Sequence, residues 1–155
     1  MPASAQERGR RSGGPERGLR PGAPDRGVRL EGLRGEAFRE AELEQGSTIL
    51  VVWASWSPKC RDIVDRVNAL QSRWSSSARV VTVNFQEDPE DARRFLEGKR
   101  LEAPVFMDRV GAFAKKHSVA TLPSLLLFRD GRELYRGALP ADVDRLIAST
   151  FENAR

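Results

Sequence analysis

The sequence has one cysteine, Cys60, and one histidine, His117, among 155 residues. A single cysteine excludes an internal disulfide, and one cysteine with one histidine cannot supply the ligands of a conventional Cys/His zinc site. We expect no metal and no other cofactor, and we expect His117, in a lysine-rich stretch, to lie at the surface. Long hydrophobic runs are also missing. No segment approaches the 18 or so apolar residues of a membrane-spanning helix, so no membrane span is expected.

Positive charge is concentrated near the N-terminus. Residues 1–35 carry eight Arg and four acidic residues, and the whole chain has a net charge of +4, so residues 36–155 sum to zero. A nucleic-acid-binding surface needs basic residues clustered on a folded face. The sequence therefore does not predict a nucleic acid as a partner.

Residues 1–35 are rich in Arg, Gly and Pro and poor in apolar residues. Such a segment cannot bury enough surface to offset the entropy lost on ordering, so we expect a disordered tail at 1–35 and one folded domain at 36–155. The pair Arg10 and Arg11 is not followed by the apolar stretch of an export signal. The expected location of the chain as written is cytoplasmic.

Apolar periodicity divides residues 36–155 into alternating helices and strands. Strands buried on both faces are expected where short apolar runs are rich in β-branched residues, and helices where apolar residues recur every three to four positions. The expected helices are 36–45, a helix of about four turns opening at Ser57 and Pro58, 89–98, 110–117 and one from 140 onward. The expected strands are 48–53, 79–85, 104–107, 124–128 and its hairpin partner 133–136.

This order of elements predicts an α/β fold. Early β-α-β units imply parallel strands joined by right-handed crossovers, and the late hairpin adds antiparallel pairing at one edge. We expect three layers, α/β/α, around a central mixed sheet of about five strands.

Three segments resemble the signatures of the thioredoxin fold. Residues 52–60, VWASWSPKC, resemble the strand end and the Cys-x-x-Cys that opens a helix. Residues 119–128, VATLPSLLLF, resemble the segment with a cis proline before a core strand, and residues 128–137 resemble the family's hairpin and closing glycine. The helix and strand added between Phe85 and Pro123 are similar to the insertion of the TlpA/ResA and peroxiredoxin branch.

The resemblance implies thiol–disulfide exchange, but Ser57 stands where the attacking cysteine would be. A serine hydroxyl is not appreciably ionised near neutral pH and forms no disulfide, so the two-thiol cycle cannot run in this chain. Ser57 has an alternative role as a helix N-cap. The acidic partners that relatives carry are also replaced, by Val51 and Ile63.

Cys60 is then either an inert, half-buried remnant or a single reactive thiol. One catalytic hypothesis is a one-Cys, peroxiredoxin-like thiol peroxidase in which the Ser57 hydroxyl assists Cys60, although Trp53 stands where that pattern has proline. The preferred hypothesis is a thioredoxin-like protein that binds polypeptides, or acts through one thiol, without turnover. The resemblance places a polypeptide or thiol-containing partner in a groove near Trp56, Pro58, Leu122 and Pro123.

Overall fold

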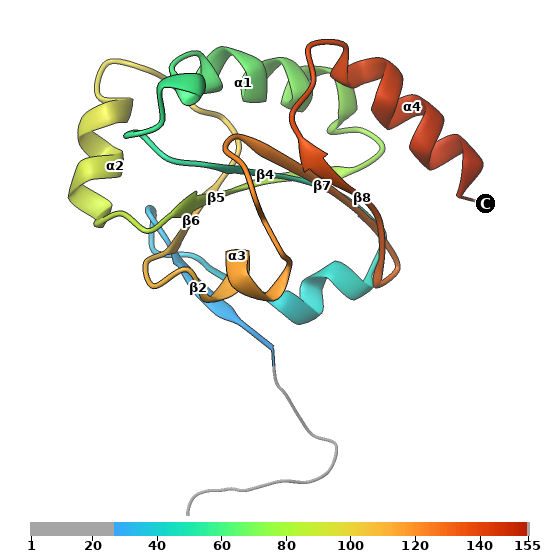
Figure 1. The fold of residues 1–155 in the computed structure, drawn as a ribbon, viewed down its shortest axis with the longest axis horizontal. Helices are drawn as coiled ribbons and strands as arrows, with labels where there is room; N and C mark the ends of the chain where they lie inside the picture. Colours follow the sequence, from blue (N-terminus) through green and yellow to red (C-terminus); the bar gives the residue numbers. More distant parts are fainter. Residues whose placement is uncertain (1–26, 155) are drawn as a thin grey trace, which may run out of the picture.

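The computed structural model describes residues 27–154, and Figure 1 shows their arrangement. The helices are α1 (Ile63–Trp74), α2 (Pro89–Leu96), α3 (Ala112–Lys116) and α4 (Val143–Asn153), with two 3-10 helices, η1 (Glu40–Glu44) and η2 (Pro58–Cys60). The strands are β2 (Arg29–Gly32), β3 (Ala37–Arg39), β4 (Ser47–Trp53), β5 (Arg79–Phe85), β6 (Val105–Asp108), β7 (Ser124–Arg129) and β8 (Arg132–Ala138). No helix in this part of the chain is both long and apolar enough to cross a bilayer.

All of these strands belong to one mixed sheet in the order β3-β2-β6-β5-β4-β7-β8. Strands β4, β5 and β6 are parallel neighbours, β7 runs antiparallel to β4, and β8 closes the predicted hairpin with β7. The α/β class and the mixed sheet are confirmed. The expected number of about five strands is wrong, because the sheet has seven strands and extends beyond β6 through β2 and β3.

Helices cover both faces of the sheet. In Figure 1, α1 and α4 lie over one face, whereas α3 and η1 lie under the other. Successive residues of β4 alternate between two cores, as the period of a strand requires. Ile49, Val51 and Trp53 join the core under α1, and Leu50 and Val52 join the core that contains Phe113 of α3. All five side chains are fully buried, which explains the continuous apolar run.

The folded domain begins earlier than expected. Strand β2 falls inside the segment 1–35 and pairs antiparallel with β6. It buries Leu30 in the core between the sheet and α3. The boundary predicted at residue 35 is therefore too late. The remainder of that predicted disordered segment, residues 1–26, lies outside the described residues.

The prediction of a helix at 36–45 is wrong for the first part of that segment. Its first half forms strand β3, which pairs with β2, and only η1 is helical. Phe38 is fully buried, and its ring centroid lies 5.2 Å from that of Phe106. Tertiary packing and strand pairing thus override a local sequence rich in helix-forming residues.

Lys116 and His117, at the end of α3, are tied to the N-terminal part of the fold. Glu40 accepts hydrogen bonds from the Val28 N–H at 2.8 Å, from Lys116 Nζ at 2.8 Å and from His117 Nε2 at 2.6 Å. The His117 side chain is only 14% exposed and its ring packs against Phe113. The prediction of a surface histidine is therefore wrong, because the His117 imidazole is hydrogen-bonded to the Glu40 carboxylate and packed against the fold.

Candidate functional site

The predicted site residues lie at the carboxyl end of β4. Trp53 and Ala54 are fully buried, and the chain then turns so that Trp56 emerges with 57% of its surface exposed. The Ser57 N–H donates to the Ala54 carbonyl at 3.2 Å and closes this turn. The end of a buried strand thus presents one large aromatic side chain to solvent beside Ser57.

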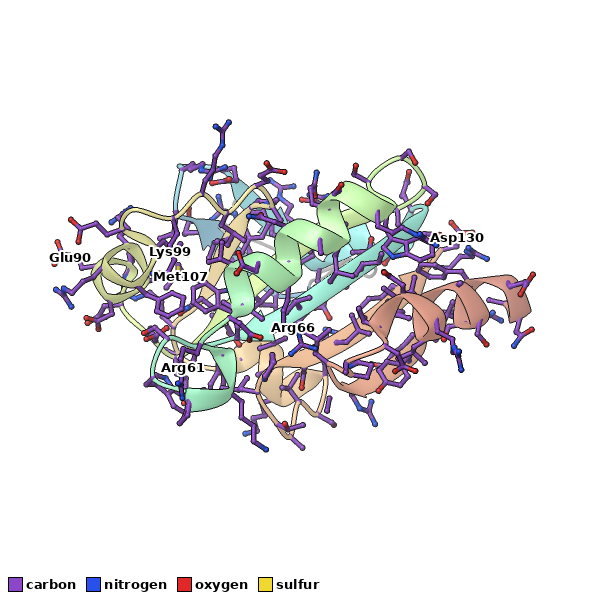
Figure 2. The ribbon with its side chains drawn as sticks, turned by 90° about the horizontal axis from the view of Figure 1, so that it is seen from above. Arg61, Arg66, Glu90, Lys99, Met107 and Asp130 are labelled. Atoms are coloured by element: carbon purple, nitrogen blue, oxygen red, sulfur yellow. The ribbon has the colours of Figure 1, made fainter. Side chains whose placement is uncertain are left out.

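Ser57 and Cys60 bracket η2. Ser57 occupies the N-cap position before Pro58, as expected, but its hydroxyl makes no capping hydrogen bond. The Cys60 N–H donates to the Ser57 carbonyl at 2.9 Å, so the two residues begin and end one tight turn. The predicted continuous helix is wrong here: η2 ends at Cys60 and α1 starts only at Ile63. Figure 2 shows Arg61, which follows this turn, at the outside of the molecule.

Cys60 has none of its surface exposed and belongs to the core under α1. Burial raises the pKa of the Cys60 thiol above its ordinary value, and the negative charges of Glu87 and Asp62 raise it further. Hydrogen bonds from the Ala54 backbone and the Ser57 side chain act in the opposite direction and do not outweigh burial. The thiolate, which is the nucleophilic form, is therefore disfavoured, and attacking reagents have no direct access.

A buried carboxylate that the sequence analysis missed lies beside this turn. Glu87 follows β5 and is 8% exposed. Its Oε1 accepts hydrogen bonds from the Ser55 N–H at 2.8 Å and from Asn84 Nδ2 at 2.7 Å, and its Oε2 accepts one from the Ser55 hydroxyl. Glu87 therefore fixes the loop that carries Trp56.

A usable signal for Glu87 was present in the sequence. Strands β4 and β5 are parallel, and Trp53 is paired with Asn84, so the residues after the two strands meet at one edge of the sheet. A polar Asn84 inside a buried strand, with an acidic residue shortly after it, points to that edge. Glu87 thus brings an acidic side chain to this edge from the loop after β5, although Val51 and Ile63 are apolar.

An open groove of about 870 Å³ lies on the α2 side of Trp56. Its walls come from the loop after β4, the start and outer face of α2, and the turn after β6. Besides Trp56 and Glu87, the groove is lined by Ser55, Gln86, Asp88, Asp91, Arg94, Phe95, Arg109 and Val110. We refer to it as the Trp56 groove.

The Trp56 groove does not include the cis proline. The Leu122–Pro123 peptide bond is cis, as expected. Pro123 is buried, Leu122 is half-buried and contacts both cores, and neither residue lines the Trp56 groove. Within residues 27–154, the Leu122 backbone forms no hydrogen bond with another backbone group.

The loop after β8 lies against this cis proline. The Leu139 N–H donates to the Pro123 carbonyl at 3.1 Å. Arg66 of α1 holds the same loop by donating to the carbonyls of Leu139 and Pro140, at 3.1 and 2.8 Å. In Figure 2 the labelled Arg66 lies between α1 and the C-terminal part of the chain.

In the part of the chain that the structure describes, no group of three or more His, Cys, Asp or Glu side chains is placed to hold a metal ion. The chemistry available at the site is that of one buried thiol, one hydroxyl and one buried carboxylate.

Comparison with known proteins identifies the family. A family model described as a thioredoxin-like domain matches residues 34–149. The chain is 26% identical over 91 residues to sporulation thiol-disulfide oxidoreductase A of Bacillus subtilis, a match that covers 56% of this chain and 55% of that protein. It is 23% identical over 108 residues to thiol-disulfide oxidoreductase ResA of Halalkalibacterium halodurans, covering 69% and 61% of the two chains.

A solved structure agrees with these relatives. The crystal structure of a putative thiol:disulfide interchange protein DsbE from Chlorobium tepidum superposes with a TM-score of 0.70 at 27% identity, covering 82% of this chain and 92% of that one. The matched segments span little more than half the length of the two curated relatives. Fold, motifs and relatives lead to one conclusion: the chain belongs to the thioredoxin-like family, in its TlpA/ResA-like branch.

Proposed function

We propose that this protein binds extended polypeptide segments at the surface around Trp56, Pro58, Leu122 and Pro123, without catalysing dithiol exchange. The observation that carries the proposal is the pairing of Ser57, in the place of the attacking cysteine, with a Cys60 that has no exposed surface. With Ser57 in that place, the chain lacks the nucleophile of a dithiol cycle. The surface proposed to hold a polypeptide still has an exposed aromatic side chain, that of Trp56.

Two backbone features support polypeptide binding. The Leu122 backbone is free of hydrogen bonds to other described backbone groups, so its N–H and carbonyl remain available to an extended chain. The adjoining loop is held by Arg66 and Pro123, which keeps this surface pre-organised. An exposed tryptophan such as Trp56 is a typical anchor for a partner chain.

The alternative, a one-Cys thiol peroxidase, needs an accessible thiolate at Cys60. Full burial raises the pKa of the Cys60 thiol and opposes that hypothesis, whereas the Ser57 side chain acts to lower that pKa without outweighing burial. A cytoplasmic location, expected from the sequence alone, stays a prediction.

The test uses a reduced, carboxymethylated polypeptide that cannot fold, with binding measured by fluorescence anisotropy. Cys60→Ala should bind like the wild type, Trp56→Ala should bind at least tenfold more weakly, and Trp56→Phe should retain most of the affinity because an aromatic anchor remains. Arg145→Ala, an exposed change on α4, serves as the control. Loss of binding in Cys60→Ala, or rapid peroxide consumption by the wild type that depends on Cys60, would overturn the proposal.

A further inference from the structure

The Trp56 groove contains a negative charge without a positive partner among the described residues. Glu87 is held by three hydrogen bonds from neutral donors, and no basic side chain in residues 27–154 forms an ion pair with it. Burying a charge without a counter-charge is unfavourable, so this carboxylate is suited to a cation that arrives from outside.

The two arginines in the groove do not fill this role. Arg94 pairs with Asp91 and Arg109 with Asp88, each at 2.8 Å and each largely exposed. Their charges are already balanced at the rim. The groove therefore has two ion pairs at its exposed rim, in which the charges balance, and one buried carboxylate, that of Glu87, without a basic partner among the described residues.

Glu87 also has room for another donor. A carboxylate offers about four acceptor positions, and its Oε2 uses only one of them, for the Ser55 hydroxyl. The exposed indole of Trp56 lines the same groove. An aromatic face beside a carboxylate is the combination that a guanidinium group recognises, because the guanidinium stacks on the ring and donates to the oxygen.

We propose that the Trp56 groove binds an arginine side chain of the polypeptide partner, with Trp56 as its stacking wall and Glu87 as its counter-charge. The inference rests on the proposed function and adds the chemistry of the residue that is recognised. It predicts a preference for segments with a basic residue close to the stretch that crosses Leu122 and Pro123.

The probe is N-acetyl-arginine amide, titrated into the ¹⁵N-labelled full chain and followed at the Trp56 indole N–H, the Ser55 amide and the Asn84 side-chain amide. N-acetyl-citrulline amide, which has the same shape without the charge, is the matched probe. We expect the arginine probe to shift these signals with saturation, and the citrulline probe to bind at least tenfold more weakly. The lysine analogue should bind between the two, since it lacks the planar group.

The matched variants are Glu87→Gln, which keeps the size of the side chain, and Glu90→Gln, which removes an exposed carboxylate outside the groove. Figure 2 shows Glu90 directed away from the body of the protein. Glu87→Gln should weaken the arginine probe at least tenfold, and Glu90→Gln should not change it. Equal binding of the arginine and citrulline probes to the wild type would overturn the inference even if Glu87→Gln fails to fold.

The outcomes separate this inference from the proposed function. If the unfolded polypeptide binds but the arginine probe does not, the cation site is wrong and the polypeptide surface remains. If the arginine probe binds through Glu87 and the polypeptide does not bind, the proposed function is wrong. A gain in probe affinity when Arg10 and Arg11 are both changed to Gln would identify the chain's own N-terminal segment as the occupant and overturn the assignment to a partner.

Discussion

Ser57→Cys should restore the two-thiol motif that this chain lacks. The two residues are the ends of one turn, with the Cys60 N–H 2.9 Å from the Ser57 carbonyl. The Cα atoms at the two ends of such a turn lie within about 7 Å of each other, which overlaps the range that a disulfide spans. We therefore expect the variant to oxidise to an intramolecular disulfide.

The size of the effect follows from the short loop. Closing a loop of four residues removes about 6 cal/mol/K of entropy from the unfolded chain, or roughly 2 kcal/mol at 25 °C. In a folded unit of this size, that difference corresponds to a rise in Tm of roughly 6–10 °C for the oxidised variant over its reduced form.

Thermal unfolding, followed by circular dichroism with and without dithiothreitol, measures this difference. Insulin disulfide reduction in the same samples tests whether exchange activity is regained, and Ser57→Ala controls for loss of the hydroxyl. The wild type should show neither effect, because it has one thiol. Two free thiols in the oxidised variant, or an oxidised form no more stable than the reduced one, would refute the reasoning.

Three further changes probe the fold around the site. Phe38→Ala should lower the free energy of unfolding by about 3–5 kcal/mol, because the ring is fully buried; urea unfolding measures it, and a loss below about 1 kcal/mol would mean that β3 is not part of the core. Arg66→Met should lower it by about 1–3 kcal/mol and speed hydrogen exchange in the loop before α4, because two carbonyls lose their donor; unchanged exchange would contradict this. Hydrogen bonds to Glu40 outweigh its burial and hold its pKa below the usual value near 4.5, so its contribution to stability is present above that pH and is lost as the pH falls through the lower folded value. Glu40→Gln should therefore make stability depend less on pH below about 5, as acid titration of the unfolding midpoint would show, and an unchanged acid profile would exclude this role.

The strands that carry the site were predictable because their neighbours bury them completely. Residues 49–53 form a continuous apolar run, residues 79–85 are rich in β-branched residues, and such segments have few alternatives to a strand buried on both faces. The same holds for β7. Family motifs then placed Ser57, Cys60 and Pro123 at the right ends of these elements.

The N-terminal hairpin could not be predicted in the same way. Strand β2 offers one buried side chain, Leu30, within a charged stretch, and the segment around Phe38 has the composition of a helix. Both become strands only because the edge of β6 is available for pairing. Glu87 was missed for a related reason: its partner Ser55 lies in the loop after β4 and its partner Asn84 in β5, and only the parallel pairing of the two strands brings them together.

The pairing of β2 with β6 has a consequence for how the protein is made. Glu31 lies opposite Met107, so β2 has to wait until more than half of the described domain has been synthesised before it can pair with β6. During that interval β6 can emerge with an unpaired edge, and such an edge invites pairing with another chain. The hairpin of β2 and β3 therefore closes this edge of the sheet only after β6 has been synthesised, although both of its strands precede β6 in the chain.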